Sequence, residues 1–195
     1  MIARMDPFAR FAAWFEEARH PAILDRTAMS LATATPDGVP SVRMVLLKGF
    51  DARGFVFYMN VQSRKGGELQ ANPRASLNFY WQGLERQVRI EGPVTPVSEG
   101  EADAYFATRP RGAQIGAWAS DQSRPMSERS ALERRIVEVE TRYQGGEVPR
   151  PPQWSGFRLK PSRIEFWTGR ESRLHEREAF TRDGDGPWKM ELLYP

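Results

Sequence analysis

The chain begins with apolar residues at helical spacing. Asp6 is a good N-cap residue, and Pro7 suits the first helical position. The apolar positions that follow share one helical face and are Phe8, Phe11, Ala12 and Phe15. The residue before a proline disfavours helical geometry, so His20-Pro21 predicts that this helix ends within residues 1–20.

Later segments also carry helix signals. Ser98 and Glu101 have the spacing of a capping box, and Ser63 can cap a short helix. The clearest helix spans 127–144, because its charges pair four residues apart and its apolar positions form one stripe. That stripe consists of Leu132, Ile136, Val139 and Tyr143. Prolines and glycines over 109–126 predict instead a long loop with a short helical turn.

Elsewhere the apolar pattern has a period of two, which is typical of strands. Segments 27–35 and 39–48 flank the turn signal Pro36-Asp37-Gly38 and predict a hairpin. Further strands are expected at 54–60, 74–81, 84–94, 156–167, 173–182 and 187–193, so the region 156–195 is mainly strand. Strands and helices do not alternate as a doubly wound sheet requires. We therefore expect one domain over 1–195, of the α+β class, mostly antiparallel and barrel-like.

Composition narrows the class of protein. With 195 residues, 40% of them hydrophobic and 27% charged, the chain suits one domain, or two small ones, with a sizeable core. The absence of Cys excludes disulfides, cysteine-based metal sites and a Cys nucleophile, and two His leave little room for a metal site. No apolar run could span a bilayer and charges interrupt the N-terminus, so we expect a cytoplasmic protein.

The net charge of +3 is too small to predict a nucleic-acid binder. Position is more informative, because many basic residues stand at strand ends and loop starts, where ligand sites are usually built. They are Arg43, Lys48, Arg64, Lys65, Arg86, Arg109, Arg111, Arg173 and Arg177. Such a dispersed set suits a small phosphorylated ligand, and solvated surface charge is the open alternative. Arg64-Lys65 is the better local signal, since both follow Ser63 at a helix start that favours an anion.

One spacing constrains how two of these residues can share a site. Arg43 and Lys48 are an odd number of positions apart, so a flat strand would point them to opposite faces. Either the strand ends, twists or bulges near Leu47, or the two residues reach different ligands.

A second spacing concerns the C-terminal region. In a strand, Arg173, His175 and Arg177 would share one face. Two Arg and one His are costly in a core unless they are paired, so a ligand site and an exposed strand face are equally open readings. No dinucleotide fingerprint or P-loop motif accompanies them, which leaves a Rossmann site unsupported.

Several short segments together resemble the pyridoxamine 5′-phosphate oxidase family, the FMN-dependent enzymes of vitamin B6 metabolism. In chain order they are RMVLLK at 43–48, VFYMN at 56–60, SRK at 63–65, LERQV at 84–88, YFATRPR at 105–111, QIGAW at 114–118, QS at 122–123, EFW at 165–167 and RLHER at 173–177. They extend over nearly the whole chain. Each segment alone is weak, but the set in this order is specific.

The resemblance implies a fold and a reaction. The expected fold is an FMN-binding split β-barrel of the Greek-key type, in a homodimer with FMN at the subunit interface. The expected reaction oxidises pyridoxamine or pyridoxine 5′-phosphate to pyridoxal 5′-phosphate, with hydride transfer to the flavin and reoxidation by O2 to hydrogen peroxide. The flavin would supply the redox chemistry, so a chain without Cys presents no obstacle.

The resemblance also implies roles for individual residues. The implied FMN ligands are Arg43, Met44, Val45, Leu46, Leu47, Lys48, Tyr58, Met59, Arg64, Lys65, Gln87, Gln122, Ser123, Trp167 and Arg177. The implied substrate ligands are Lys48, Tyr105, Arg109, Arg173, Leu174 and His175. Of these, Arg173 and His175 would lie at the substrate ring and favour the geometry of hydride transfer.

One position departs from the family pattern. Ala113 stands where the family has a Ser, so one hydroxyl contact to the substrate phosphate would be missing, which implies weaker substrate binding.

Two other functions stay open. One is a related flavin oxidase of the phenazine-biosynthesis type, and the other is a non-catalytic flavin- or haem-binding split-barrel protein. The presence of Lys48, Tyr105, Arg109, Arg173 and His175 argues against the first, which Ala113 weakly favours. The second would not need Arg173 and His175.

Overall fold

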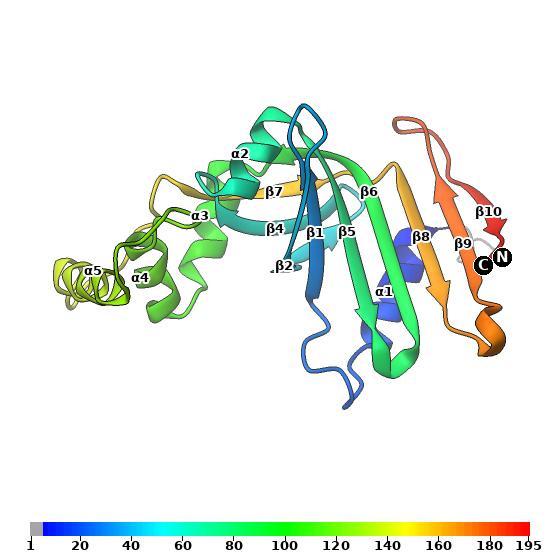
Figure 1. The fold of residues 1–195 in the computed structure, drawn as a ribbon, viewed down its shortest axis with the longest axis horizontal. Coiled ribbons are helices and arrows are strands. Elements are labelled where there is room, and N and C mark those ends of the chain that lie inside the picture. Colours follow the sequence, from blue (N-terminus) through cyan, green and yellow to red (C-terminus); the bar gives the residue numbers. More distant parts are fainter. Residues whose placement is uncertain (1–5) are drawn as a thin grey trace.

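A computed structural model describes residues 6–195 as an α+β fold in which a long antiparallel sheet curls into a half-barrel (Figure 1). The strands are β1 (Ala28–Ala34), β2 (Pro40–Leu46), β3 (Gly49–Asp51), β4 (Gly54–Asn60), β5 (Arg74–Trp81), β6 (Arg86–Pro96), β7 (Trp154–Leu159), β8 (Arg163–Thr168), β9 (Glu176–Thr181) and β10 (Lys189–Leu193). The helices are α1 (Pro7–Glu17), α2 (Arg64–Ala71), α3 (Glu99–Ala107), α4 (Arg111–Ala119) and α5 (Arg129–Arg142), with short 3-10 turns η2 (Gln82–Leu84) and η3 (Glu171–Arg173). The predicted class is confirmed. Within 6–195, the helices are all too short or too polar to cross a membrane.

Strand β6 connects the two parts of the sheet. Its first part pairs with β8 and β5, and its end, from Val94, pairs with β7, which in turn pairs with β4. Gly92 lies between these two parts, where an added Cβ would come within 2.1 Å of the Lys160 carbonyl oxygen. Only a residue without a side chain allows the backbones to approach so closely. The main path of the sheet runs β10-β9-β8-β6-β5-β1-β2, so β2 is an edge strand.

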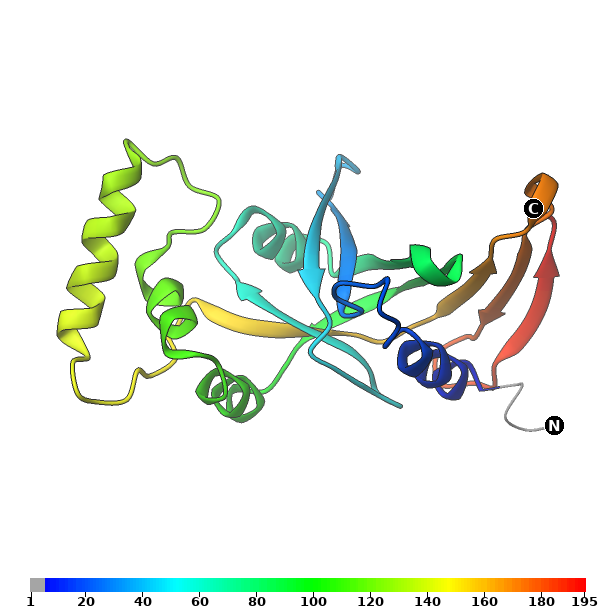
Figure 2. The same cartoon turned by 90° about the horizontal axis from the view of Figure 1, so that it is seen from below.

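Helix α1 covers the concave side of the sheet with aromatic side chains (Figure 2). Asp6 caps it by accepting a hydrogen bond from the Phe8 backbone N–H at 3.0 Å. Phe11 is fully buried and contacts Phe55, Phe79 and other rings at centroid distances near 5 Å. The part of the predicted 1–20 helix segment before residue 6 lies outside the described residues.

A second, smaller core joins α4 and α5. Ile115 and Ala119 of α4 are buried against Val139 of α5, with Leu132 and Ile136 beside them. The 127–144 segment is therefore a helix, as its stripe predicts. The expectation of a loop over 109–126 is wrong for its first half, where α4 forms nine residues despite two glycines. Burial of its apolar face against α5 outweighs the low helix propensity of glycine.

The C-terminal strands differ from two predictions. The expected strand 156–167 is two strands, β7 and β8, because the chain turns at Pro161. The expected strand 173–182 begins only at Glu176, since Ser172 and Arg173 adopt left-handed geometry with φ of 56° and 61°. The prediction that Arg173 and His175 share a strand face with Arg177 is therefore wrong.

Candidate active site

A cavity of about 240 Å³ opens between β2, β4, α2 and α3. Its lining comes from distant parts of the sequence and consists of Met44, Val45, Leu46, Lys48, Tyr58, Met59, Lys65, Tyr105, Arg109, Gln122 and Trp154. A neighbouring cavity of about 340 Å³ shares part of this lining and continues along α4. All the lining residues of the first cavity except Trp154 carry a ligand role by resemblance, so folding brings most of one predicted site together.

The end of β2 places Lys48 at this cavity. The strand stops at Leu46, and Leu47 turns inward, where it is 4% exposed and its N–H donates to the Thr27 carbonyl. The N–H of Lys48 then pairs with the Val56 carbonyl oxygen at 2.9 Å. The strand thus ends near Leu47, which is one of the two arrangements that the spacing of Arg43 and Lys48 requires.

One wall of the cavity is a cluster of three nearly parallel aromatic rings. The Tyr58 ring centroid lies 4.2 Å from that of Tyr105 and 5.1 Å from that of Trp154, and the Tyr105 and Trp154 centroids are 6.1 Å apart. Gly156 makes room for the Tyr58 ring, since an added Cβ there would come within 2.7 Å of that ring. Burial, with the nearby charge of Glu101, raises the pKa of the Tyr58 hydroxyl. The wall therefore offers an apolar aromatic surface on which the Tyr58 hydroxyl is neutral.

Arg109 is a cavity residue whose side chain needs an anionic hydrogen-bond acceptor. Its guanidinium lies 4.8 Å from the Trp154 ring centroid, and burial lowers the pKa of Arg109. Within residues 6–195, its Nη1 is buried and has no hydrogen-bond partner. A buried guanidinium donor without an acceptor is costly, and a phosphate oxygen would satisfy it with a charge-assisted bond.

Lys65 brings a second cation to the cavity from α2. Ser63 caps this helix by accepting a hydrogen bond from the Gly66 N–H, which holds Lys65 in its first turn. Only 9% of Lys65 is exposed, and its Nζ donates to Oε1 of Gln122 at 2.9 Å. Burial and the nearby charge of Arg43 lower the pKa of Lys65. A buried ammonium at a helix N-terminus is a favourable place for an anionic group.

Arg43 and Arg64 lie behind the cavity, joined by a buried carboxylate. Glu68 accepts from Arg64 Nε at 2.9 Å, from Arg43 Nη2 at 3.3 Å, and from the hydroxyls of Ser41 and Thr33. Burial alone would raise the pKa of the Glu68 carboxyl, but these hydrogen bonds and the charge of Arg43 lower it to about 2. The two guanidinium groups are thus held in place before any ligand binds.

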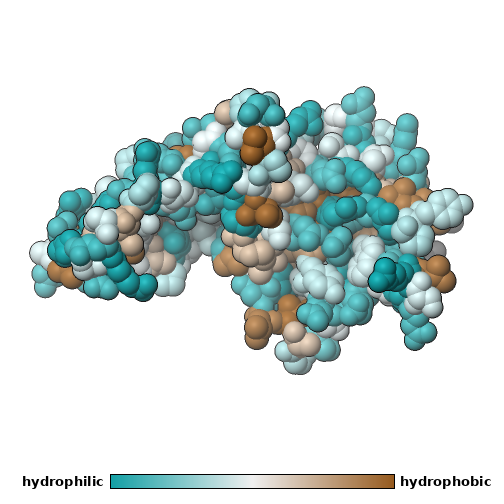
Figure 3. All heavy atoms as spheres, in the orientation of Figure 1, coloured by the Kyte–Doolittle hydropathy of each residue, from teal (hydrophilic) through white to brown (hydrophobic). Residues whose placement is uncertain are grey.

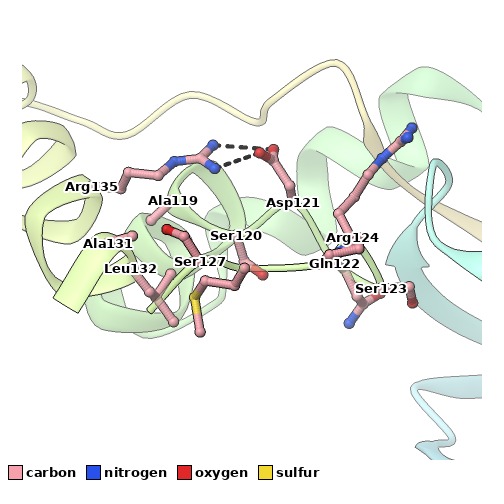
Figure 4. Close-up of a pocket in the computed structure, with 12 residues that line it drawn as sticks. Ala119, Ser120, Asp121, Gln122, Ser123, Arg124, Ser127, Ala131, Leu132 and Arg135 are labelled. Carbon is pink, nitrogen blue, oxygen red and sulfur yellow. Dashed lines mark hydrogen bonds and ion pairs between the residues drawn. The ribbon is translucent and has the colours of Figure 1, made fainter. Parts of the chain in front are cut away.

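The loop that carries Gln122 and Ser123 leads from α4 to α5. Figure 4 shows it beside a further cavity of about 350 Å³, with Asp121 paired to Arg135 of α5. Gln122 reaches back from this loop to Lys65. Ser123 lies beside it with a left-handed φ of 71°.

The other predicted ligands form a second group, away from the cavity. Gln87 of β6, Trp167 of β8 and Arg177 of β9 are neighbours in register across the sheet. Arg173, Leu174 and His175 lie in the turn between β8 and β9. Both ribbon views show β8 and β9 on the opposite side of the central strands from α3 and α4 (Figures 1 and 2). One chain therefore holds two separate parts of the predicted site.

Some cavity residues were missed by the sequence analysis. Trp154 is not among the predicted site residues, yet it forms part of a cavity wall, opposite Asn60 at the end of β4. The neighbouring cavity adds Asn60, Gly116, Ala117 and Ser120, and it also contains Ala113. Three of the four added residues come from the segment interpreted mainly as loop, which concealed that α4 presents one small-residue face to a cavity.

Comparisons with known proteins agree with this geometry. A family profile described as pyridoxamine 5′-phosphate oxidase matches residues 15–143, and one described as the pyridoxine 5′-phosphate oxidase C-terminal dimerisation region matches 154–195. A pyridoxine/pyridoxamine 5′-phosphate oxidase from Rubrobacter xylanophilus is 59% identical over 97% of this chain and 87% of its own length. The match therefore covers both groups of candidate site residues.

Two solved structures are similar as well. PhzG from Burkholderia lata, in complex with tetrahydrophenazine-1-carboxylic acid, has a TM-score of 0.92 and 34% identity, over 98% of this chain and 93% of that one. A pyridoxamine 5′-phosphate oxidase-related, FMN-binding protein from Nostoc punctiforme has a TM-score of 0.78 and 19% identity, over 98% and 99%. The predicted split-barrel fold is confirmed by this similarity.

Proposed function

Because the chain belongs to the pyridoxamine 5′-phosphate oxidase family, we propose that it is an oxidoreductase that converts pyridoxamine or pyridoxine 5′-phosphate to pyridoxal 5′-phosphate. Its cofactor is FMN, its electron acceptor is O2 and its second product is hydrogen peroxide. The single observation that carries the proposal is the buried, partnerless Nη1 of Arg109 in the described chain, set in a cavity with Lys48 and Tyr105. That donor set suits a substrate bearing a phosphate.

The substrate phosphate is held by Lys48, Tyr105 and Arg109. Together they offer two cations and one hydroxyl, converging from the link between β2 and β3, from α3 and from the segment before α4. Ala113 lines the adjacent cavity and provides no hydroxyl there. With its phosphate held there, the substrate ring lies against the aromatic wall formed by Tyr58, Tyr105 and Trp154, and packing on that wall favours one orientation of the ring.

The residues around the cavity also fit FMN. Lys65, Arg64 and Arg43, with Gln122 and Ser123, hold its phosphate and the adjoining chain. The charges of these residues match a phosphate dianion. Glu68 holds the guanidinium groups of Arg43 and Arg64 in place, and the buried ammonium of Lys65 lies nearby. The residues proposed to line the flavin ring on this chain are Met44, Val45, Leu46, Leu47, Tyr58 and Met59. Bound FMN supplies the hydride acceptor and the means of passing electrons to O2.

The chain works as a homodimer in which each active site is completed by both subunits. The C-terminal profile is described as a dimerisation region and covers every member of the second group of candidate residues except Gln87. Edge strand β2 exposes Val42, Met44 and Leu46, and Figure 3 shows apolar side chains among polar ones over this part of the molecule. In the dimer, Gln87, Trp167 and Arg177 of a second copy face the flavin. The same copy's Arg173, Leu174 and His175 face the substrate.

A related oxidase acting on a phenazine precursor is the second candidate. The similarity to PhzG, which was solved with a tetrahydrophenazine carboxylic acid, is the observation in its favour. The phosphate-binding set around Arg109 supports the first candidate instead, because a substrate with a single carboxylate offers fewer acceptors and less charge to the two cations Lys48 and Arg109. The cytoplasmic location expected from the sequence stays a prediction.

The test uses purified protein loaded with FMN in air-saturated buffer. Pyridoxamine 5′-phosphate and pyridoxine 5′-phosphate are added separately, and pyridoxal 5′-phosphate and hydrogen peroxide are measured together. We expect both products in equal amounts. A protein that binds FMN but forms neither product refutes the proposal. Oxidation of the tetrahydrophenazine carboxylic acid without oxidation of either vitamer assigns the second candidate.

A further inference from the structure

Arg150 lies in a proline-rich link between α5 and β7. Pro149 precedes it and Pro151 and Pro152 follow it, and a proline restricts its own backbone and that of the residue before it. The carbonyl oxygen of Pro149 accepts a hydrogen bond from Nε1 of Trp118 in α4 at 2.7 Å. The backbone at Arg150 is therefore constrained independently of the contacts that its side chain makes.

The side chain of Arg150 joins α3 to the start of β7. It is 10% exposed, its Nε donates to Oδ1 of Asp103 at 2.6 Å, and its Nη2 forms an ion pair with Glu99. Its Nη1 donates to the carbonyl oxygen of Trp154 at 2.7 Å. Each nitrogen of the guanidinium thus has its own acceptor, two on the helix and one on the strand.

Helix α3 has little apolar surface with which to hold its position. Two of its nine residues, Ala102 and Phe106, are buried. Its first half carries three carboxylates, of which Arg150 pairs with two, and Arg158 of β7 pairs with the third, Glu101, at 2.6 Å. The position of α3 therefore depends on these ion pairs as well as on two apolar side chains.

The position of α3 matters because the helix carries part of the cavity. Tyr105 belongs to α3 and Arg109 follows it by two residues, and both line the cavity. Both also lie near Trp154, whose ring centroid is 6.1 Å from that of Tyr105 and 4.8 Å from the Arg109 guanidinium. Arg150 thus contacts both the helix and the residue beside which these two groups are placed.

We infer that Arg150 is a positioning residue of the active site, which holds α3 against the start of β7 and so fixes Tyr105 and Arg109 for the substrate phosphate. Arg150 itself is absent from the cavity lining, so it acts through those two residues. The inference rests on the proposed function, since it assumes that Tyr105 and Arg109 bind that phosphate. Its loss weakens substrate binding and leaves FMN and the hydride-transfer step in place.

The first test measures the helix directly, without relying on activity. Hydrogen exchange is followed by mass spectrometry in the FMN-loaded wild type and in Arg150→Met, which keeps an apolar side chain but removes the three donors. We expect the amides of 99–107 to exchange at least tenfold faster in the variant, because α3 loses two ion pairs, while those of α1 stay unchanged. Unchanged exchange in α3 overturns the inference.

The second test measures steady-state kinetics and FMN affinity of the same variant. We expect KM for pyridoxamine 5′-phosphate to rise about tenfold, with kcat within about twofold of wild type and FMN affinity unchanged. Asp103→Asn, which alters the exposed partner of the same ion pair, should raise KM about threefold and gives the answer if Arg150→Met does not fold. An unchanged KM in the folded variants overturns the inference, as do equal losses of kcat and FMN affinity.

The matched control is Arg134→Met on α5. Arg134 also pairs with a carboxylate, that of Glu128 at 2.9 Å, but it is 62% exposed and lies outside the cavity lining. We expect it to leave KM and the exchange of α3 unchanged, and a rise in KM equal to that of Arg150→Met overturns the inference. If the wild-type protein oxidises neither vitamer, the proposed function fails, and the exchange of α3 still decides whether Arg150 holds the helix.

Discussion

Replacement of Glu68 by Gln tests whether the buried carboxylate stabilises the cluster behind the cavity. The side chain of Glu68 is 5% exposed and receives hydrogen bonds from two hydroxyls and two guanidinium groups. Gln keeps the shape but removes the charge that Arg43 and Arg64 share. One buried acceptor oxygen becomes a donor, which then faces a guanidinium group that can only donate.

The magnitude follows from the pKa of Glu68. That pKa falls from 4.5 to about 2 on folding, and a shift of this size corresponds to about 3 kcal/mol of folding stability at pH 7. Because the folded-state pKa is depressed, this stability is fully present above pH 4.5 and is lost as the pH falls through 2. The difference between wild type and Glu68→Gln is therefore about 3 kcal/mol at pH 7 and about 1.4 kcal/mol at pH 3.

The assay is urea unfolding of both proteins at pH 7, 4 and 3, at one protein concentration because dimer stability depends on it. The matched control is Glu133→Gln on α5, since Glu133 is 68% exposed and its nearest cation is 3.9 Å away. We expect the control to change stability by less than about 0.5 kcal/mol at every pH. A loss below about 1 kcal/mol for Glu68→Gln at pH 7, or a loss that does not shrink in acid, would refute the reasoning.

Three further predictions concern binding and turnover. Ala113→Ser adds a hydroxyl at the cavity wall, so KM for pyridoxamine 5′-phosphate, measured by steady-state kinetics, should fall about fivefold with kcat unchanged. An unchanged KM would contradict the assignment of position 113 to the substrate phosphate. Lys65→Ala removes a buried cation, so FMN affinity measured by fluorescence quenching should fall at least tenfold while the KM for substrate changes little. An unaltered FMN affinity would count against a contact between Lys65 and the FMN phosphate. Arg173→Ala should lower kcat about a hundredfold and leave FMN content intact; equal losses would place Arg173 at the cofactor instead.

Local signals in the sequence predict the parts of the fold that short-range chemistry decides. Asp6, Ser63 and Ser98 each cap a helix through the expected backbone N–H. Gly38 adopts a φ of 88° in the predicted hairpin turn, which is why that turn could be identified. Such features depend on two to four neighbouring residues, so a single sequence contains the needed information.

Other parts depend on contacts that no local pattern encodes. Helix α4 forms because Ile115 packs on α5, and its glycines gave the opposite signal. The turn at Ser172 uses left-handed geometry at residues that rarely adopt it, so alternation alone suggested a strand. In the same way, Trp154 could not be distinguished from core, because its cavity exists only where β7 meets β4 and α3.

The residues of the candidate site were predicted mainly from the resemblance to the oxidase family. The odd spacing of Arg43 and Lys48 required either a break in the strand near Leu47 or two different ligands, and the strand ends at Leu46. The structure gathers Lys48, Tyr105 and Arg109 at one cavity. It does not bring Arg173 or His175 to that cavity within one chain. The physical reason we propose is symmetry: when two copies share each site, residues that act together need not be neighbours in one chain.

Subunit complementation tests the shared site most directly. Arg109→Ala and Arg173→Ala alter the two separate groups, so each variant alone should be nearly inactive. Dimers formed by mixing them contain one intact site, and random exchange of subunits should restore roughly a quarter of the wild-type rate of pyridoxal 5′-phosphate formation. A mixture of Arg109→Ala with Lys48→Ala, which lie in the same group, should stay inactive. A mixture of Arg109→Ala with Arg173→Ala that is no more active than its parents would contradict the account.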